Sequence, residues 1–132
     1  MKITIPIKTL NVSNQREHWA VRQKRVKGQR EAVAWSVLAQ APSIELIEDG
    51  LKQGKAFHIT LTRIAPRMLD QHDGLPCALK PIADEVAKQL GVDDRDKRVE
   101  WRYAQCRGKV REYAVQIEIN AAQPVLDHQK GQ

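Results

Sequence analysis

The sequence predicts a single α+β domain in which helices pack on one mixed β-sheet. Its 132 residues suit one domain of ordinary size. Stretches of alternating apolar and polar residues, typical of half-buried strands, are interleaved with stretches whose apolar residues recur every three or four positions, typical of helices. The expected order is β-α-β-α-β-β. Residues 1–120 are expected to form the domain, and the polar residues 121–132 a flexible C-terminal tail.

The first elements follow from local composition. Residues 3–7 alternate isoleucine with other residues and predict a strand, which Pro6 favours at a sheet edge. Residues 8–28 are rich in Lys and Arg and are expected to form an irregular or partly helical basic arm. Residues 29–41 are rich in Ala, Glu, Val and Leu and predict a helix that ends before Pro42.

A second strand and a long helix follow. A loop around residues 48–50 leads into alternating residues 56–64, which predict the strand. Apolar residues at spacings of three and four predict a helix over residues 75–90 that stops at Gly91. Because Pro81 does not fit a helix interior, we expect a kink or a restart there.

Two further strands are predicted over residues 99–103 and 113–119, with a basic hairpin loop over residues 106–109 between them. Trp35 and Trp101 lie on apolar faces of their elements, so we expect both to pack in the core.

Charge and cysteine content narrow the functional classes. The 22 Lys and Arg against 16 Asp and Glu give a net charge of +6, which fits a protein that binds a polyanion and equally a solvated basic surface. Cys77 and Cys106 are too few for a disulfide framework and are expected to be reduced thiols. No apolar run approaches the length of a membrane span. We therefore expect a cytoplasmic protein with no membrane association.

Two acidic clusters flank the long predicted helix. Asp70 and Asp73 precede it, and Asp93, Asp94 and Asp96 follow it. Mg²⁺ binds carboxylate oxygens together with substrate phosphate and water, so the clusters could hold this ion if the chain folds back. In the alternative interpretation, which spacing alone favours, Asp73 caps the helix and the later acids form a solvated turn.

Other residues near these clusters have open roles. Lys80 could offset charge on a phosphate, or pair with Asp84 as an ordinary surface pair four residues apart. His72 could be a metal ligand or a proton shuttle, although a lone histidine is more often neither. The sequence has no Walker-type loop, no Gly-x-Ser-x-Gly and no zinc pattern, so acyl transfer and nucleotide-driven chemistry have no support.

The basic arm and later loops are the candidates for contacting DNA. Such cations would make sequence-independent phosphate contacts that weaken with salt. Trp19 lies among the cations of the arm and could touch DNA as well. The predicted DNA-binding residues are Arg16, Trp19, Arg22, Lys24, Arg25, Lys27, Arg67, Arg107 and Lys109.

Three separated segments, Leu69–Leu75, Ala78–Asp84 and Leu90–Asp96, resemble the RusA-type Holliday junction resolvases, small endodeoxyribonucleases commonly carried by phages and prophages. The close match covers residues 57–119. The resemblance implies a homodimeric α+β protein that binds four-way DNA junctions and nicks two strands symmetrically with Mg²⁺, with no small-molecule cofactor. Rival functions are a nuclease for flaps or forks and a non-catalytic protein that binds branched DNA.

The same resemblance assigns the site residues. Asp73 takes the second acid of the family's Asp-x-Asp-Asn-Leu motif, Lys80 its lysine and Asp94 its late acid. The first acid of the motif falls on Gln71, so Asp70 is the available substitute. Besides this change, Gly74 replaces the usual Asn, and Lys80 follows Asp73 at a longer spacing than in the best-known members. The implied metal ligands are Asp70, Asp73 and Asp94.

Overall fold

A computed structural model describes residues 1–9, 19–93 and 95–122 of the chain. Three helices and a mixed sheet of four strands lie within these residues and confirm the predicted single α+β domain. In chain order the elements are β1 (Lys2–Ile5), α1 (Trp19–Leu38), α2 (Ala41–Lys52), β2 (Phe57–Ala65), α3 (Gly74–Leu90), β3 (Val99–Arg107) and β4 (Ala114–Ala121).

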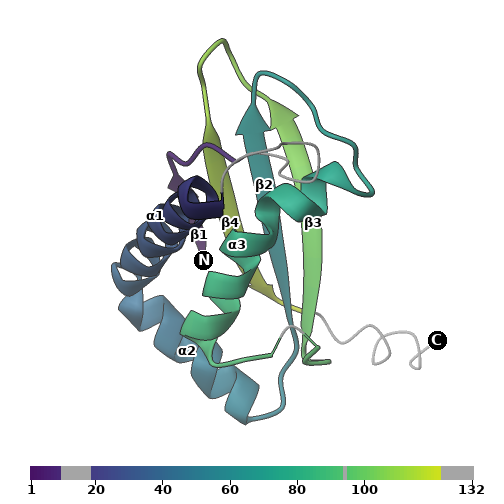
Figure 1. The fold of residues 1–132 in the computed structure, drawn as a ribbon. Helices are drawn as coiled ribbons and strands as arrows, with labels where there is room; N and C mark the ends of the chain where they lie inside the picture. Colours follow the sequence, from purple (N-terminus) through teal and green to yellow (C-terminus); the bar gives the residue numbers. More distant parts are fainter. Residues whose placement is uncertain (10–18, 94, 123–132) are drawn as a thin grey trace, which may run out of the picture.

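The sheet has the strand order β1-β4-β2-β3 (Figure 1). β2 pairs with β3 in parallel and with β4 in antiparallel orientation, and Ile59 lies opposite Trp101 on one side and Ile119 on the other. β1 pairs with β4 alone and forms an edge, as predicted. Alternate residues of β2 are buried, because the helices cover one face of the sheet (Figure 1).

The core lies between that face and α3. It contains Ile59 and Leu61 from β2 and Leu79 and Ile82 from α3, none of which exposes any surface. α3 continues through Pro81, and Figure 1 shows its axis bending along its length, so the predicted kink occurs without a restart. The bend is expected, because a proline inside a helix cannot donate the backbone hydrogen bond to the preceding turn.

The first helix begins earlier than predicted, within the arm that was expected to be irregular or partly helical, and it ends at Leu38 instead of residue 41. α1 begins at Trp19, so residues 19–28 of the predicted basic arm are helical, whereas residues 10–18 lie outside the described residues. The prediction started at residue 29 because the preceding turns lack an apolar stripe. These turns consist largely of Arg, Lys and Gln, which have high helix propensity, and α1 buries only Gln29, Val33 and Val37.

The predicted loop around residues 48–50 is wrong, because this segment belongs to α2. Pro42 lies in the first turn of α2, where a missing N–H costs little, so it marks the start of α2, whereas α1 already ends at Leu38. Gly50 was interpreted as a turn residue, yet it is a packing position. A Cβ there would lie 2.8 Å from Cζ of Phe57.

The predicted hairpin of the last two strands is also wrong. β3 and β4 do not pair, because β2 lies between them. The connection from β3 to β4 crosses the end of β2, where the Gly108 N–H donates to the Ala65 carbonyl at 2.8 Å. A Cβ on Gly108 would approach Cγ2 of Ile64 at 3.1 Å, so the crossing favours glycine. Alternation predicted which residues share a strand face but not which strand is the partner.

Four further sequence predictions can be compared with the structure. Trp35 is 72% exposed on α1, so its predicted place in the core is wrong, since Val33 and Val37 make the buried contacts of that segment. Trp101 is partly buried against the core, as predicted. Most of the predicted C-terminal tail lies outside the described residues, and Ala121 ends β4. No helix within the described ranges is long and apolar enough to cross a membrane.

An ion pair joins α1 to α3 and yields a stability prediction. Arg30 Nε donates to Oε1 of Glu85 at 2.9 Å, and Gln89 donates to the other carboxylate oxygen at 2.7 Å. Glu85 is 5% exposed. Burial acts to raise the pKa of Glu85, but the hydrogen bonds from Gln89 and Arg30 outweigh it and hold the pKa below its ordinary value of 4.5.

We expect Glu85→Gln to lower the free energy of unfolding by about 2 kcal/mol at pH 7, because it removes a charged hydrogen-bond acceptor. A lowered carboxyl pKa stabilises the fold above the ordinary pKa and ceases to do so as the pH falls through the folded value. The difference should therefore shrink below the ordinary value of 4.5 in urea titrations. Glu45→Gln on the exposed face of α2 is the control. A difference that stays constant down to pH 3 would contradict the role of the ion pair.

Candidate nucleic-acid interface

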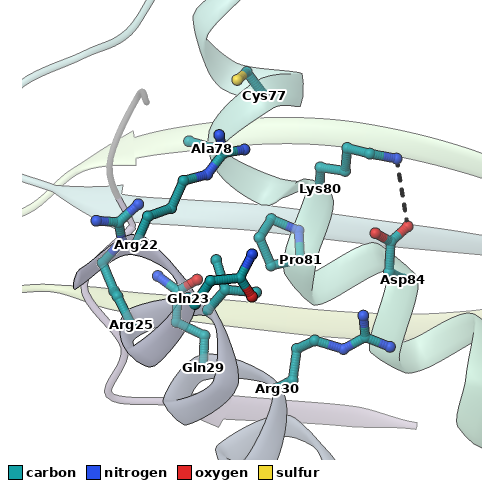
Figure 2. A pocket seen from close by; sticks show the side chains of 11 residues that line it. Arg22, Gln23, Arg25, Gln29, Arg30, Cys77, Ala78, Lys80, Pro81 and Asp84 are labelled. Atoms are coloured by element: carbon teal, nitrogen blue, oxygen red, sulfur yellow. Dashed lines mark ion pairs between the residues drawn. The ribbon is translucent and has the colours of Figure 1, made fainter. Parts of the chain in front are cut away.

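A basic cleft of about 340 Å³ lies between α1 and α3 (Figure 2). Arg22, Arg25 and Arg30 line it from α1 and Lys80 from α3, whereas Asp84 is the one acidic residue of its lining. Of these four cations, Arg30 is paired with the neighbouring Glu85 and Lys80 with Asp84. The charge that remains around the cleft is positive and favours an anionic ligand.

Helical spacing explains why several lining residues of the cleft come from one face of α1. Arg22, Val26 and Gln29 recur at spacings of four and three, so they lie on one face of the helix. Gln29 is buried and donates to the Lys8 carbonyl at 2.9 Å, which fixes the face relative to the chain after β1. Arg30 is absent from the predicted DNA-binding residues because the predicted arm ends at residue 28. A helix that begins at Trp19 would have shown that Arg30 lies at helical spacing from Arg22.

Lys80 makes the surface pair that its spacing predicts. Its Nζ lies 3.6 Å from Oδ1 of Asp84, and its side chain is 69% exposed (Figure 2). An exposed pair at this distance contributes little stability, so Lys80 can exchange Asp84 for a phosphate at small cost. The two interpretations of Lys80 are therefore compatible in this structure.

The other predicted DNA-binding residues surround the cleft or lie at the same end of the sheet. Lys24 and Lys27 line a shallower groove beside the cleft, and Trp19 is 70% exposed at the start of α1. Arg16 lies outside the described residues. The remaining three residues are exposed near the ends of β2 and β3: Arg67, Arg107 and Lys109. The first turns of α1 and α3 lie at the same end of the sheet (Figure 1).

Asp70 and Asp73 lie together in the turn between β2 and α3. Oδ2 of Asp70 accepts the Asp73 N–H at 2.9 Å, and both residues are exposed. Asp73 is the N-cap residue of α3, but its own side chain makes no capping hydrogen bond. Asp73 therefore occupies the predicted N-cap position, but its side chain does not cap the helix. Two carboxylates at one helix start suit Mg²⁺, which commonly binds one or two carboxylates with water and phosphate.

A glutamine clamp holds this acidic turn against β3. The side-chain amide of Gln105 donates to the Leu69 carbonyl at 2.8 Å and accepts the Leu69 N–H at 2.9 Å. Gln71 donates to the Tyr103 carbonyl at 3.1 Å. Gln71, which stands where the resemblance puts the first acid, therefore joins the turn to β3. Nothing in the sequence pattern singles out Gln105, because its role depends on the parallel pairing of β3 with β2.

The later acids lie at the other end of α3. This helix of 17 residues spans about 25 Å along its axis. Oδ1 of Asp93 accepts the Arg95 N–H at 2.9 Å, as in a solvated turn. Hydrogen bonds from the Arg98 side chain and backbone lower the pKa of Asp96 to about 2, and Arg98 also donates to the Leu51 carbonyl at 2.6 Å. Asp94 itself lies outside the described residues.

Within the part of the chain that the structure describes, no three His, Cys, Asp or Glu residues gather into a group that could hold a metal. His72 accordingly belongs to no such group. The described part of the candidate centre is the pair Asp70 and Asp73, with Lys80 two turns along α3.

A comparison of the chain with models of protein families and with the sequences of curated proteins finds no significant match in either.

The clamp predicts a stability effect. Gln105→Ala leaves the backbone N–H and carbonyl of Leu69 without their partner, so we expect the free energy of unfolding to fall by about 1–3 kcal/mol. Amide hydrogen exchange should accelerate at Leu69 more than in β2. The exposed Gln53, changed to Ala, is the matched control. Unchanged exchange at Leu69 would show that the clamp does not hold the acidic turn.

Proposed function

We propose that this protein is a Mg²⁺-dependent endodeoxyribonuclease that resolves four-way DNA junctions by paired symmetric nicks. The observation that carries the proposal is the basic cleft beside the acidic turn, with both formed in part by α3. The resemblance of residues 57–119 to RusA-type resolvases supplies the substrate class and the reaction. We assign this activity to DNA recombination and repair in the cytoplasm, where Cys77 and Cys106 would remain free thiols.

The spacing along α3 supports a shared DNA strand. Asp73, Cys77 and Lys80 follow one another at intervals of four and three residues and so lie along one face of the helix. Seven residues from Asp73 to Lys80 correspond to a rise of about 10 Å. One strand of B-DNA advances about 3.4 Å along the duplex axis per phosphate, so this rise matches about three phosphates where α3 lies parallel to that axis. A backbone held in the basic cleft would then pass the acidic turn.

The residues would share the work of phosphodiester hydrolysis. When bound, Mg²⁺ supplies an activated water and offsets negative charge on the scissile phosphate. Asp70 and Asp73 would hold this ion, with Asp94 as the third ligand that the resemblance implies. Lys80 would leave Asp84 and stabilise the charge that develops on the phosphate. The cations of α1 would bind and orient the flanking backbone.

A homodimer fits the symmetry of the substrate. A four-way junction offers two equivalent strands, so a two-fold dimer with one site in each subunit would cut both.

A second candidate is a protein that binds branched DNA without cutting it. The observation that favours it is the separation of Asp93 and Asp96 from the acidic turn by the length of α3, together with the lack of a three-ligand group among the described residues. Its signature is junction binding with no Mg²⁺-dependent product. A flap- or fork-directed nuclease would instead cut those substrates faster than a four-way junction.

The acidic turn gives the first test. We expect Asp73→Asn to lower the rate of junction cleavage by at least about 100-fold, because an amide is a poor ligand for Mg²⁺. Junction affinity, measured by gel shift in Ca²⁺, should be unchanged or higher since a negative charge beside the DNA is removed. Asp49→Asn on the exposed surface of α2 should cut normally. Full activity of Asp73→Asn would refute the assignment.

The basic cleft gives the second test. Arg22→Ala should weaken junction binding, and the slope of log K against log salt should become shallower by about 0.9 for each lost phosphate contact. Lys55→Ala, which changes an exposed cation outside the lining of the cleft, should leave the slope unchanged. Equal slopes for Arg22→Ala and wild type would exclude the cleft as the site of phosphate binding.

A further inference from the structure

A second pocket adjoins the basic cleft, on the side of α3 that faces the edge strand β3. Trp101 and Tyr103 line it from β3, and Pro76, Lys80 and Ala83 are among its lining residues from α3. Its volume of about 450 Å³ is within the range of pockets that hold small organic groups. We call it the aromatic pocket.

Trp101 carries an unmet hydrogen-bonding requirement in the wall of this pocket. Its Nε1 is buried and has no hydrogen-bond partner among the described residues. Buried indole N–H groups normally find an acceptor, because leaving one unpaired is costly. Because Nε1 is itself buried, a flat ring in the pocket would instead meet the part of the indole that lines it and stack there.

The aromatic pocket shares a wall with the basic cleft. Cys77, Lys80 and Asp84 line both, so this turn of α3 forms a ridge between them. A cationic cleft on one side and aromatic side chains on the other match the two parts of a nucleotide, its phosphate and its base. Proteins that bind single strands combine the same elements, a positive groove for the backbone and aromatic side chains for the bases.

We propose that the aromatic pocket binds one unpaired nucleobase of the strand whose backbone lies in the basic cleft. The inference rests on the proposed DNA function. Within a duplex the base is stacked and paired, and extruding it costs energy, whereas a strand exchange point can supply an unpaired base more cheaply. The pocket would therefore add selectivity for branched over linear DNA, with little preference among bases because stacking is sequence-tolerant.

The experiment compares three DNAs of equal length: a four-way junction with one unpaired thymidine at the exchange point, the same junction with an abasic residue there, and a linear duplex. Affinities are measured by fluorescence anisotropy in Ca²⁺. Wild type should prefer the thymidine junction to the abasic junction by between about 5- and 150-fold, the range found for one stacked base. Trp101→Leu should lose this preference and still bind the abasic junction, and Trp35→Leu should retain it.

A second measurement avoids any effect of substitution on folding. With 5-iodouracil as the unpaired base, photocrosslinking of wild type followed by mass spectrometry should modify Trp101 or Tyr103. A crosslink confined to another residue, such as the exposed Trp19, would overturn the proposal. Equal affinity of wild type for the thymidine and abasic junctions would also overturn the proposal, although DNA binding itself would then be intact. Failure to bind any of the three DNAs would overturn the proposed function together with this inference.

Discussion

The packing of α1 against α3 is the constraint on which the rest of the molecule depends. Arg30 and Glu85 join the two helices at 2.9 Å, beside the fully buried Val33 and Val86. Arg30 also lines the cleft of about 340 Å³ between the two helices. The cost of burying Glu85 is offset by its two hydrogen bonds, so the same contact stabilises the fold and holds a residue of the cleft in place.

α3 gives the surface its polarity. The acidic turn lies at its start, Lys80 and Asp84 occupy its middle, and Arg98 anchors the turn beyond its end to α2. A basic cleft therefore adjoins two carboxylates at a helix start, where the helix dipole also favours anions. In the proposed function, the cations would bind a nucleic-acid backbone and the carboxylates would recruit a divalent ion to one of its phosphates.

The sequence allowed the α+β class, the edge position of β1, β2 and the long helix to be predicted, because period and proline placement are local signals. The sequence-based predictions were wrong where an element depends on a packing partner or a neighbouring strand. Gly50 looked like a turn because nothing local shows that Phe57 packs against it. β3 looked like half of a hairpin because alternation does not identify the neighbouring strand. At the site, the position of Asp70 and Asp73 just before the long helix was predictable from the sequence, whereas the clamp by Gln105 and the place of Arg30 in the cleft depend on the tertiary arrangement.

One measurement tests the central claim most directly. Wild-type protein is incubated with a four-way junction in which each strand is end-labelled in turn, with and without Mg²⁺, beside a linear duplex of the same sequence. A junction-resolving nuclease predicts nicks in two opposite strands at symmetrical positions, dependent on Mg²⁺, with the linear duplex intact. Four intact strands at every Mg²⁺ concentration, with the junction still bound, would contradict the assignment of nuclease activity and leave a protein that binds branched DNA.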